Sequence, residues 1–401
     1  MKNKRGSSSV FLMVILAALI SIVLALVYSI REEDINSRAD AVINLAGDSV
    51  ISEFDYYVQK EYGLFMLRGT DKELAGKLRS YVNYAFENVD GVKVEDMKVS
   101  TAKFSVINKE NVISQIREHM KLMEAEGILD RIGKEEYEQY NAMPERVLRY
   151  GPAIVSLPSA EVPEKKLSAL AESIADNASD IESVFNAGTD KFILNRYILL
   201  HFNNRNHMTD QDHFFKNEVE YILGGKLSDR KNEKRMEIAL KAMRFPLNLA
   251  HIYADPDKRA ATMALAQILT PGAAAAATQA ALSSTWAYAE ADNDVKLLWQ
   301  GSKVPVIKDK ETWAMDLDSA VEGIFGGTVK PKKEKGYNYE EYLQILLYFQ
   351  EDNIKTARIL DLIQINCRKN ENREFSIQEY ATGIAIDATI NGKRYSYEKQ
   401  Y

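Results

Sequence analysis

The chain has 401 residues, of which 46% are hydrophobic, a formal net charge of −7 and a single cysteine. The hydrophobic content is that of a folded protein. One cysteine excludes an intramolecular disulfide and any zinc site that needs two thiolates from this chain. The negative charge would repel a polyanion, so nucleic acid is not expected as a partner.

The N-terminal region contains an uncharged apolar run from Val10 to Ile30. A membrane-spanning helix needs about 20 mostly apolar residues, whereas the apolar core of a cleaved secretory signal has roughly 7–15. Three basic residues precede the run and three acidic residues follow it: Lys2, Lys4, Arg5, Glu32, Glu33 and Asp34. Because basic flanks stay in the cytoplasm, we predict a cytoplasmic tail over residues 1–9 and a transmembrane helix over residues 10–30. The protein is therefore expected in the cell membrane, where it crosses the lipid bilayer once and has its C-terminal part outside the cytoplasm.

The helical pattern continues beyond the membrane segment, since apolar side chains recur every three or four residues to about Tyr62. We predict a helical stalk over residues 31–65. Its apolar stripe, which includes Val42, Val50 and Phe54, is compatible with packing against the chain's own globular part or against neighbouring subunits. Within the membrane, the side chains expected to pack against other helices are Val14, Leu16, Leu19, Ile20, Val23 and Leu26.

The extracytoplasmic part, residues 66–401, mixes helical and strand patterns. Alternation between Val92 and Phe104 predicts a pair of strands. Prolines and a glycine near residues 151–165 indicate an irregular connection and a candidate boundary between two outer domains. A three-or-four spacing predicts helices over Asp71–Phe86, Glu110–Glu126, Ala169–Val184, Ile193–Phe202 and Asn217–Leu223.

The middle of the chain predicts further helices. One begins near Asn232, with Ser228 or Asp229 as its cap. The segment Ala260–Ala289 carries no charge, but a Pro-Gly pair at Pro271 interrupts it and its Thr, Gln and Ser side chains are costly in lipid. We therefore interpret it as two Ala-rich helices that pack closely in a soluble core.

The C-terminal region predicts a helical hairpin followed by β structure. The expected elements are helices over Tyr339–Leu347 and Lys355–Ile365 and strands over Phe375–Ile377, Gly383–Ile390 and Arg394–Tyr397. The Asn391-Gly392 pair between two alternating runs is a strong hairpin signal. Together these elements predict an α+β fold that is predominantly α.

Three histidines at equal spacings, His201, His207 and His213, are the most regular set of candidate metal ligands. Residues six apart do not share a helix face, so the segment is interpreted as a polar loop and no metal site is predicted. Acidic groups at 255–257 and 292–294 lack the full pattern of a calcium loop. We interpret both groups as helix caps.

No catalytic constellation is predicted. Glu218 and Glu220 are two residues apart on an expected helix and so do not face each other. Cys367 has no histidine nearby in sequence and is expected to be a buried, inert thiol. The sequence contains no nucleophile elbow, phosphate loop or dinucleotide fingerprint. We therefore expect no cofactor and no enzymatic activity, with an anchored hydrolase as the least favoured alternative.

The segment "RGSSSVF" from Arg5 to Phe11 resembles the anchor of TadE/TadG proteins, which are associated with tight-adherence (Flp-type) pili. Those anchors show a glycine and small residues followed by Val-Glu-Phe, whereas here Val10 is followed directly by Phe11. The resemblance implies Gly6 as a processing site. The missing glutamate is the acid that supports processing and subunit assembly in type IV pilins.

A second resemblance covers most of the remaining chain. The segments "EVEYILGGKLSD", "AYAEADNDVKLLWQGSKVPVIK", "YEEYLQILL" and "DLIQIN" are similar to DUF5702, an uncharacterised bacterial family whose members occur near Tad-type pilus components. This resemblance implies a location and an association, and it implies no catalytic residues.

Together, the anchor and the resemblances lead us to expect a membrane-anchored, pilin-like accessory or structural protein of a Tad-type pilus or secretion system. It would act by subunit packing and surface presentation. Its partners would be other Tad components or further copies of itself, bound through the N-terminal helix. The alternative is a bitopic extracytoplasmic protein that binds a ligand or mediates adhesion and has no filament role.

Overall fold

The computed structural model describes residues 5–125, 146–148, 157–162, 167–185, 190–210, 212–323 and 327–401. These residues form two compact units. Unit 1 comprises Met1–Asp55, Phe65–Asn108 and Gln378–Tyr401, and unit 2 comprises Tyr56–Leu64 and Lys109–Ile377. Helices predominate and the few strands are antiparallel, which confirms the predicted α+β, predominantly α class.

The division between the units does not coincide with the candidate boundary near residues 151–165. That stretch belongs to unit 2, and residues 151–156 and 163–166 lie outside the described part of the chain. The chain passes between the units at 55/56, 64/65, 108/109 and 377/378. Both segments of unit 2 are therefore inserted between segments of unit 1, an arrangement that local sequence patterns do not signal.

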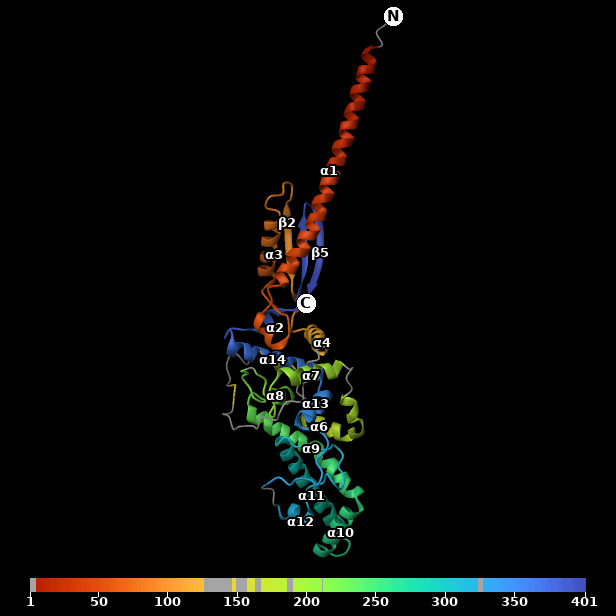
Figure 1. Ribbon diagram of the computed structural model, residues 1–401, viewed down its shortest axis with the longest axis vertical. Coiled ribbons are helices and arrows are strands. Elements are labelled where there is room, and N and C mark those ends of the chain that lie inside the picture. The colour runs from red at the N-terminus through yellow and green to blue at the C-terminus, as the bar shows by residue number, and fades with distance from the viewer. Residues whose placement is uncertain are drawn as a thin grey trace. The chain divides into compact units, whose positions relative to one another are not determined.

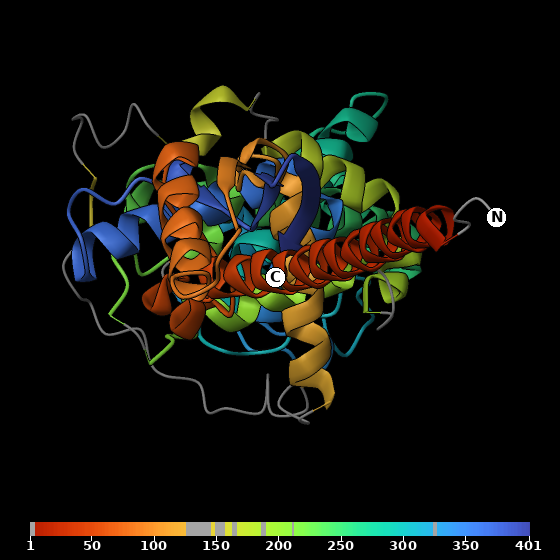
Figure 2. The same ribbon diagram turned by 90° about the horizontal axis from the view of Figure 1, so that it is seen from above.

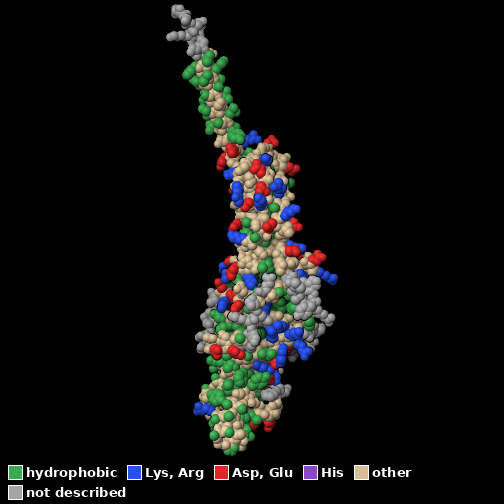
Figure 3. Space-filling model, turned by 180° about the vertical axis from the view of Figure 1, so that it is seen from behind, with side chains coloured by type: hydrophobic (Ala, Val, Ile, Leu, Met, Phe, Trp, Pro, Cys, Tyr) green, Lys and Arg blue, Asp and Glu red, His purple; other side chains and the backbone are tan. Residues whose placement is uncertain are grey.

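Helix α1 (Arg5–Ile51) is continuous but has two environments along its length (Figure 1). Among the described residues, it is the one helix long and apolar enough to cross a membrane, and its most apolar window is not buried at all. From Ala39 onwards one side of α1 is covered by unit 1. Figure 3 shows the same change, from an apolar rod to a region covered by charged side chains of both signs.

Helix α1 ends at Ile51, whereas the apolar spacing predicted a helix to about Tyr62. The ring of Phe54 packs edge-on against Phe65 with centroids 4.9 Å apart, and the Asp55 N–H donates to the Met66 carbonyl at 2.8 Å. These contacts turn the chain out of the helical path. The following helix, α2 (Tyr56–Tyr62), is a separate element of unit 2.

Unit 1 contains a three-stranded antiparallel sheet in the order β2-β4-β5, formed by β2 (Val94–Ser100), β4 (Gly383–Ile390) and β5 (Lys393–Gln400). The predicted hairpin is confirmed, because Asn391 and Gly392 both have the positive φ of a two-residue turn. The predicted strand pair between Val92 and Phe104 is wrong: β2 pairs with β4, nearly 290 residues later, and Phe104 lies in η1 (Ala102–Phe104).

One face of this sheet is covered by α1 and by α3 (Asp71–Ala85), and Figures 1 and 2 show α1 running beside β5. The other face carries polar side chains, among them Lys98, Asp387 and Arg394. The core between helices and sheet consists of Ala39, Ile43, Ala46, Val50, Leu67, Leu74, Leu78, Val82, Phe86, Met97, Val99, Ile384, Ile386, Ala388, Ile390 and Tyr395.

Gly47 lies where α1 comes closest to the sheet. A Cβ at this position would lie 2.7 Å from Cδ1 of Ile386 and 3.3 Å from Cγ of Lys399. The absence of a side chain therefore permits the close approach of helix and sheet.

A short pair of strands, β1 (Leu67–Arg68) and β3 (Tyr380–Ala381), completes unit 1 beside the main sheet. The strand predicted over Phe375–Ile377 does not form. Ile377 instead begins η5 (Ile377–Glu379), because its N–H donates to the Gln364 side chain at 3.0 Å rather than to a strand.

The first half of unit 2 is helical in its described parts. Its elements are α4 (Lys109–Ala125), η3 (Pro158–Glu161), α6 (Leu167–Asp176), η4 (Ala178–Phe185), α7 (Asp190–His201), α8 (Glu218–Gly224) and α9 (Asp229–Ala254). The helix predicted over Ala169–Val184 is divided into α6 and η4. The Ser228 hydroxyl accepts from the Lys231 N–H at 3.4 Å, which confirms the predicted cap of α9.

The second half of unit 2 contains α10 (Pro256–Leu269), α11 (Ala275–Trp299), α12 (Leu317–Glu322), α13 (Tyr339–Phe349) and α14 (Asp352–Asn370). Helix α14 is buried from Ile354 to Cys367 and packs against α4, α8 and η3. The Ala-rich segment forms α10 and α11, as predicted. Only its inner side is core, since Ala266, Ala275 and Leu282 form a small cluster while Ile268 remains 76% exposed.

Candidate functional site

The three evenly spaced histidines have separate surroundings. The Nδ1 atom of His201 is 3.0 Å from the Glu61 carbonyl and its Nε2 atom is 3.0 Å from Nε2 of His119. Burial is the main cause that lowers the pKa of His201, to about 3. His213 pairs with Glu218 at 2.6 Å, and His207 belongs to a turn with Asn204. Among the described residues, no group of three or more His, Cys, Asp or Glu side chains could hold a metal ion.

Glu218 and Glu220 are fully buried and have different partners. Glu218 accepts from His213 and also from the Asn366 amide at 2.8 Å. Glu220 accepts from the Tyr339 hydroxyl at 2.8 Å, and burial raises its pKa to about 7. The two carboxylates therefore anchor α8 to different segments, and neither is exposed to a substrate in solution.

A buried cluster of charges, which the sequence did not indicate, joins α9 to α11 and the loop after α11. Arg244 donates to Asp294 at 3.0 Å, and Lys308 bonds both Asp294, at 2.6 Å, and Glu290. All four side chains are at most 2% exposed. The cluster balances two positive and two negative groups, which is the condition under which buried charges are tolerated.

The acidic groups read as helix caps are partly confirmed. Asp255 caps α10 by accepting from the N–H groups of Asp257 and Lys258. The interpretation is wrong for residues 292–294, which lie inside α11. There, Asp292 pairs with Lys241 at 2.5 Å while Asp294 joins the buried cluster. Cys367 is buried, as predicted.

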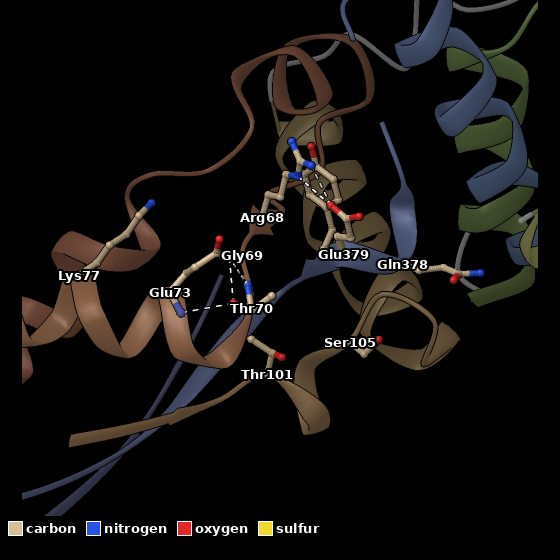
Figure 4. A pocket seen from close by; sticks show the side chains of 10 residues that line it. Arg68, Gly69, Thr70, Glu73, Lys77, Thr101, Ser105, Gln378 and Glu379 are labelled. Atoms are coloured by element: carbon tan, nitrogen blue, oxygen red, sulfur yellow. Dashed lines mark hydrogen bonds and ion pairs between the residues drawn. The ribbon is translucent and has the colours of Figure 1, made fainter. Parts of the chain in front are cut away.

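A polar cavity belongs to unit 1, where α3 begins beside β1 and β3 (Figure 4). Its volume is about 790 Å³, which lies within the usual range of ligand pockets. The lining residues are Arg68, Gly69, Thr70, Glu73, Lys77, Thr101, Ser105, Gln378, Glu379 and Tyr380. They come from segments that are about 300 residues apart in the chain and meet only because β1 pairs with β3.

Two interactions fix the wall of this cavity. The Arg68 guanidinium donates from two nitrogens to Oε2 of Glu379, at 2.9 and 2.8 Å. Thr70 and Glu73 form a capping box at the start of α3, with Glu73 Oε2 accepting from the Thr70 N–H and hydroxyl at 2.8 Å each. The hydrogen bond from the Thr70 backbone is the main cause that holds the pKa of Glu73 below its usual value.

Gly69 occupies an unusual backbone position between these two interactions. Its φ of +153° is accessible mainly to glycine, and a Cβ would lie 2.9 Å from Cδ2 of Leu74. The Thr-x-x-Glu pattern at residues 70–73 was the one local signal for this site, because it predicts the helix start. The pairing of Arg68 with Glu379 had no such signal.

The cavity is lined by polar and charged side chains that can bind a ligand through hydrogen bonds. Its lining contains neither histidine nor cysteine, and its carboxylates are bonded to a guanidinium and to a helix cap. The site offers hydrogen-bond donors and acceptors without a net charge.

The residues predicted to pack along α1 fall into two classes. The six membrane positions, Val14 to Leu26, are 51–63% exposed, so they contact little of their own chain. Val50 is fully buried in the core of unit 1, and Val42 packs against that core. The apolar stripe of α1 that includes Val42 and Val50 thus packs against the chain's own sheet. Gly6 lies in the first turn of α1, and its role in processing stays a prediction.

Comparison with known proteins gives one match. Residues 108–392 match the model of DUF5702, described as a family of unknown function. Neither the curated proteins nor the solved structures include a match.

Proposed function

Because the chain belongs to the DUF5702 family, whose function is unknown, we propose its role from its architecture. The protein is a single-pass, membrane-anchored and pilin-like accessory or structural component of a Tad-type pilus or secretion system. The N-terminal half of α1 lies in the bilayer, and the C-terminal half carries unit 1 and the inserted unit 2 outside the cytoplasm.

The observation that carries this proposal is the change in environment along α1. Its first half exposes large apolar side chains on all sides, from Phe11 at 66% to Ile30 at 67%. Water is a costly solvent for such a surface, at about 25 cal/mol per Å² of apolar area. Its second half is amphipathic and covers a sheet. One rigid helix therefore connects a segment suited to lipid with a segment suited to a folded unit.

The charges around the apolar run support the orientation. Lys2, Lys4 and Arg5 precede it, while Glu32, Glu33 and Asp34 follow. A basic N-terminal flank favours a cytoplasmic N-terminus. The two folded units would then face the cell exterior.

Subunit packing in this proposal takes place through the membrane half of α1. The six exposed apolar positions of this half are covered by lipid or by another helix, since their own chain leaves them open. The association with Tad components rests on the resemblance of the anchor and of the family. The sheet-facing side of the second half of α1 is already occupied by the core of unit 1.

Site-specific crosslinking in cells tests the proposal. Cysteines are introduced at Leu19 and Val23, which are exposed in the membrane half, and at Val50, which is buried and serves as the matched control. The native Cys367 is buried and does not interfere. We expect crosslinks from Leu19→Cys and Val23→Cys to Tad components or to a second copy, and none from Val50→Cys.

Two results would overturn the proposal. The first is a lack of crosslinks from both membrane positions in cells that assemble a Tad machine. The second is protection of unit 2 from protease added to intact cells, because this would place the folded units inside. The mass of the mature protein and of a Gly6→Ala variant tests processing separately.

A further inference from the structure

The cavity of unit 1 has hydrogen-bonding capacity that its internal contacts do not use. Glu379 receives both guanidinium bonds on Oε2, and Glu73 receives both Thr70 bonds on Oε2. Each carboxylate therefore retains Oε1 as an acceptor. Lys77 directs one bond to Glu53 and has two further N–H groups. Gln378 contributes an exposed amide, which both donates and accepts.

The charges in the wall restrict the class of ligand. The lining contains two cationic side chains, Arg68 and Lys77, and two carboxylates, Glu73 and Glu379, and Lys77 also pairs with Glu53 outside the lining. The lining residues themselves therefore carry no net charge. An anion would meet two carboxylates, and a cation would meet a guanidinium and an ammonium group. An apolar ligand would leave these polar groups without hydrogen bonds, at the cost of their desolvation.

A neutral ligand rich in hydroxyl groups satisfies all of these groups at once. Each hydroxyl donates one hydrogen bond and accepts others. It can therefore donate to Oε1 of Glu73 or Glu379 and accept from Lys77 or Gln378. Two guanidinium nitrogens of Arg68 converge on Oε2 of Glu379, so a ring hydroxyl would donate to Oε1 of Glu379 beside this pair.

We propose that this cavity binds a neutral oligosaccharide, with Arg68 and Glu379 as the central pair and Gln378, Glu73 and Lys77 around it. Gly69 lies between the two bonded pairs of the wall, where a side chain would collide with Leu74. The inference goes beyond the role proposed above and does not depend on a pilus partner. It requires only that unit 1 be folded.

Ligand-observed saturation-transfer NMR tests this site on the full-length protein in lipid nanodiscs, because sugar-headed detergents would compete. The probes are triacetylchitotriose as the neutral oligosaccharide, and trilysine and triglutamate as charged molecules of comparable size. We expect saturation transfer to triacetylchitotriose at millimolar concentration and none to either peptide.

Three variants locate the binding. Glu379→Gln removes the charge of the central pair, and Gln378→Ala removes an exposed amide. Each is expected to weaken binding at least about fivefold, the effect of losing one hydrogen bond of typical strength. Glu398→Gln is the matched control, since Glu398 pairs with Lys103 outside the cavity and its change should leave binding unaltered.

The outcomes are distinct. Binding of triacetylchitotriose that weakens in both cavity variants and persists in the control supports the inference. Absence of saturation transfer, equal binding by Gln378→Ala and the original chain, or preferential binding of a charged peptide would overturn it. A failure here leaves the membrane proposal intact, because the crosslinking experiment concerns other residues.

Discussion

Replacing Lys308 by Met should destabilise unit 2 strongly, because Lys308 neutralises two buried carboxylates. Its ammonium bonds Glu290 and Asp294, and these side chains are 2%, 0% and 0% exposed. Met fills a similar volume without a charge. In Lys308→Met, Arg244 remains the one cation of the cluster beside two carboxylates, so one buried negative charge lacks a partner.

The expected cost follows from the burial of the cluster. Removing one partner of a buried ion pair destabilises proteins by about 3–5 kcal/mol. For a unit of this size, each kcal/mol lowers the melting temperature by about 2–4 °C, so we expect a decrease of roughly 6–20 °C. A second substitution, Glu290→Gln, removes the unpaired charge, and the double variant should recover at least about 1 kcal/mol relative to Lys308→Met.

Tryptophan fluorescence is a direct assay, because Trp286 and Trp313 both donate to the Met315 carbonyl beside this cluster. Glu290 itself accepts from the Met315 N–H at 2.7 Å. Burial already raises the pKa of Glu290, and loss of Lys308 removes the main opposing cause. A carboxyl with a raised folded-state pKa contributes stability that is lost as the pH rises, so the defect of Lys308→Met should shrink as the pH is lowered.

The control for this experiment is Lys310→Met. Lys310 lies two residues away and pairs with Asp257, but these side chains are 65% and 79% exposed. Surface pairs of this kind contribute little, so the control should melt with the original chain. The reasoning is refuted if Lys308→Met is as stable as the control, or if Glu290→Gln makes the Lys308→Met variant less stable rather than more.

Three further predictions concern the core of unit 1, a buried carboxylate of unit 2 and the turn of the β4–β5 hairpin. Ile43→Ala should destabilise unit 1 by about 2–5 kcal/mol and speed hydrogen exchange in β4. Leu45 is 67% exposed on the same helix, so Leu45→Ala should have neither effect. Equal effects of the two substitutions would contradict the packing of α1 on the sheet. Glu220→Gln should remove a pH dependence of the stability of unit 2. The stability that the raised pKa of Glu220 contributes is complete below about pH 4.5 and is lost as the pH rises through about 7. The prediction is disproved if the urea midpoint changes equally between pH 5.5 and pH 8 in the variant and in the original chain. Gly392→Ala should lower the free energy of unfolding by about 1 kcal/mol through the positive φ of this residue alone, because a Cβ there meets nothing within 4 Å. Faster hydrogen exchange confined to the β4–β5 hairpin would verify this.

Local sequence patterns correctly predicted the helices and the turn that depend mainly on neighbouring residues. The 3.6-residue period located α3, α4, α7 and α9. The Asn-Gly pair located the β4–β5 hairpin, because two residues that tolerate a positive φ are enough to form such a turn. The periodicity of α1 was also correct as far as Ile51. It then failed at Phe54, where a ring contact with Phe65 has a stronger influence than helical spacing.

The long-range arrangement was not accessible in the same way. The sequence around Val99 does not indicate that this residue pairs with Ile386 in the sheet, and the sequence around Arg68 does not indicate its salt bridge with Glu379. The charged cluster was missed for the same reason, because Arg244, Asp294 and Lys308 belong to three separate segments. A charged side chain can be buried only where it has such distant partners. Local sequence patterns do not show these partners, so they predict these residues to be exposed.

The sequence order of the elements of unit 1 affects how this unit folds during synthesis. Its helix α1 is translated before unit 2, while two of the three main strands, β4 and β5, lie in residues 378–401 and follow unit 2 in the chain. Until the ribosome reaches that end, the face of α1 that carries Ile43 and Val50 has no sheet to cover it. A chain that stops before β4 leaves this apolar face of α1 open to proteases and chaperones, so the core of unit 1 is completed only after unit 2 has been synthesised.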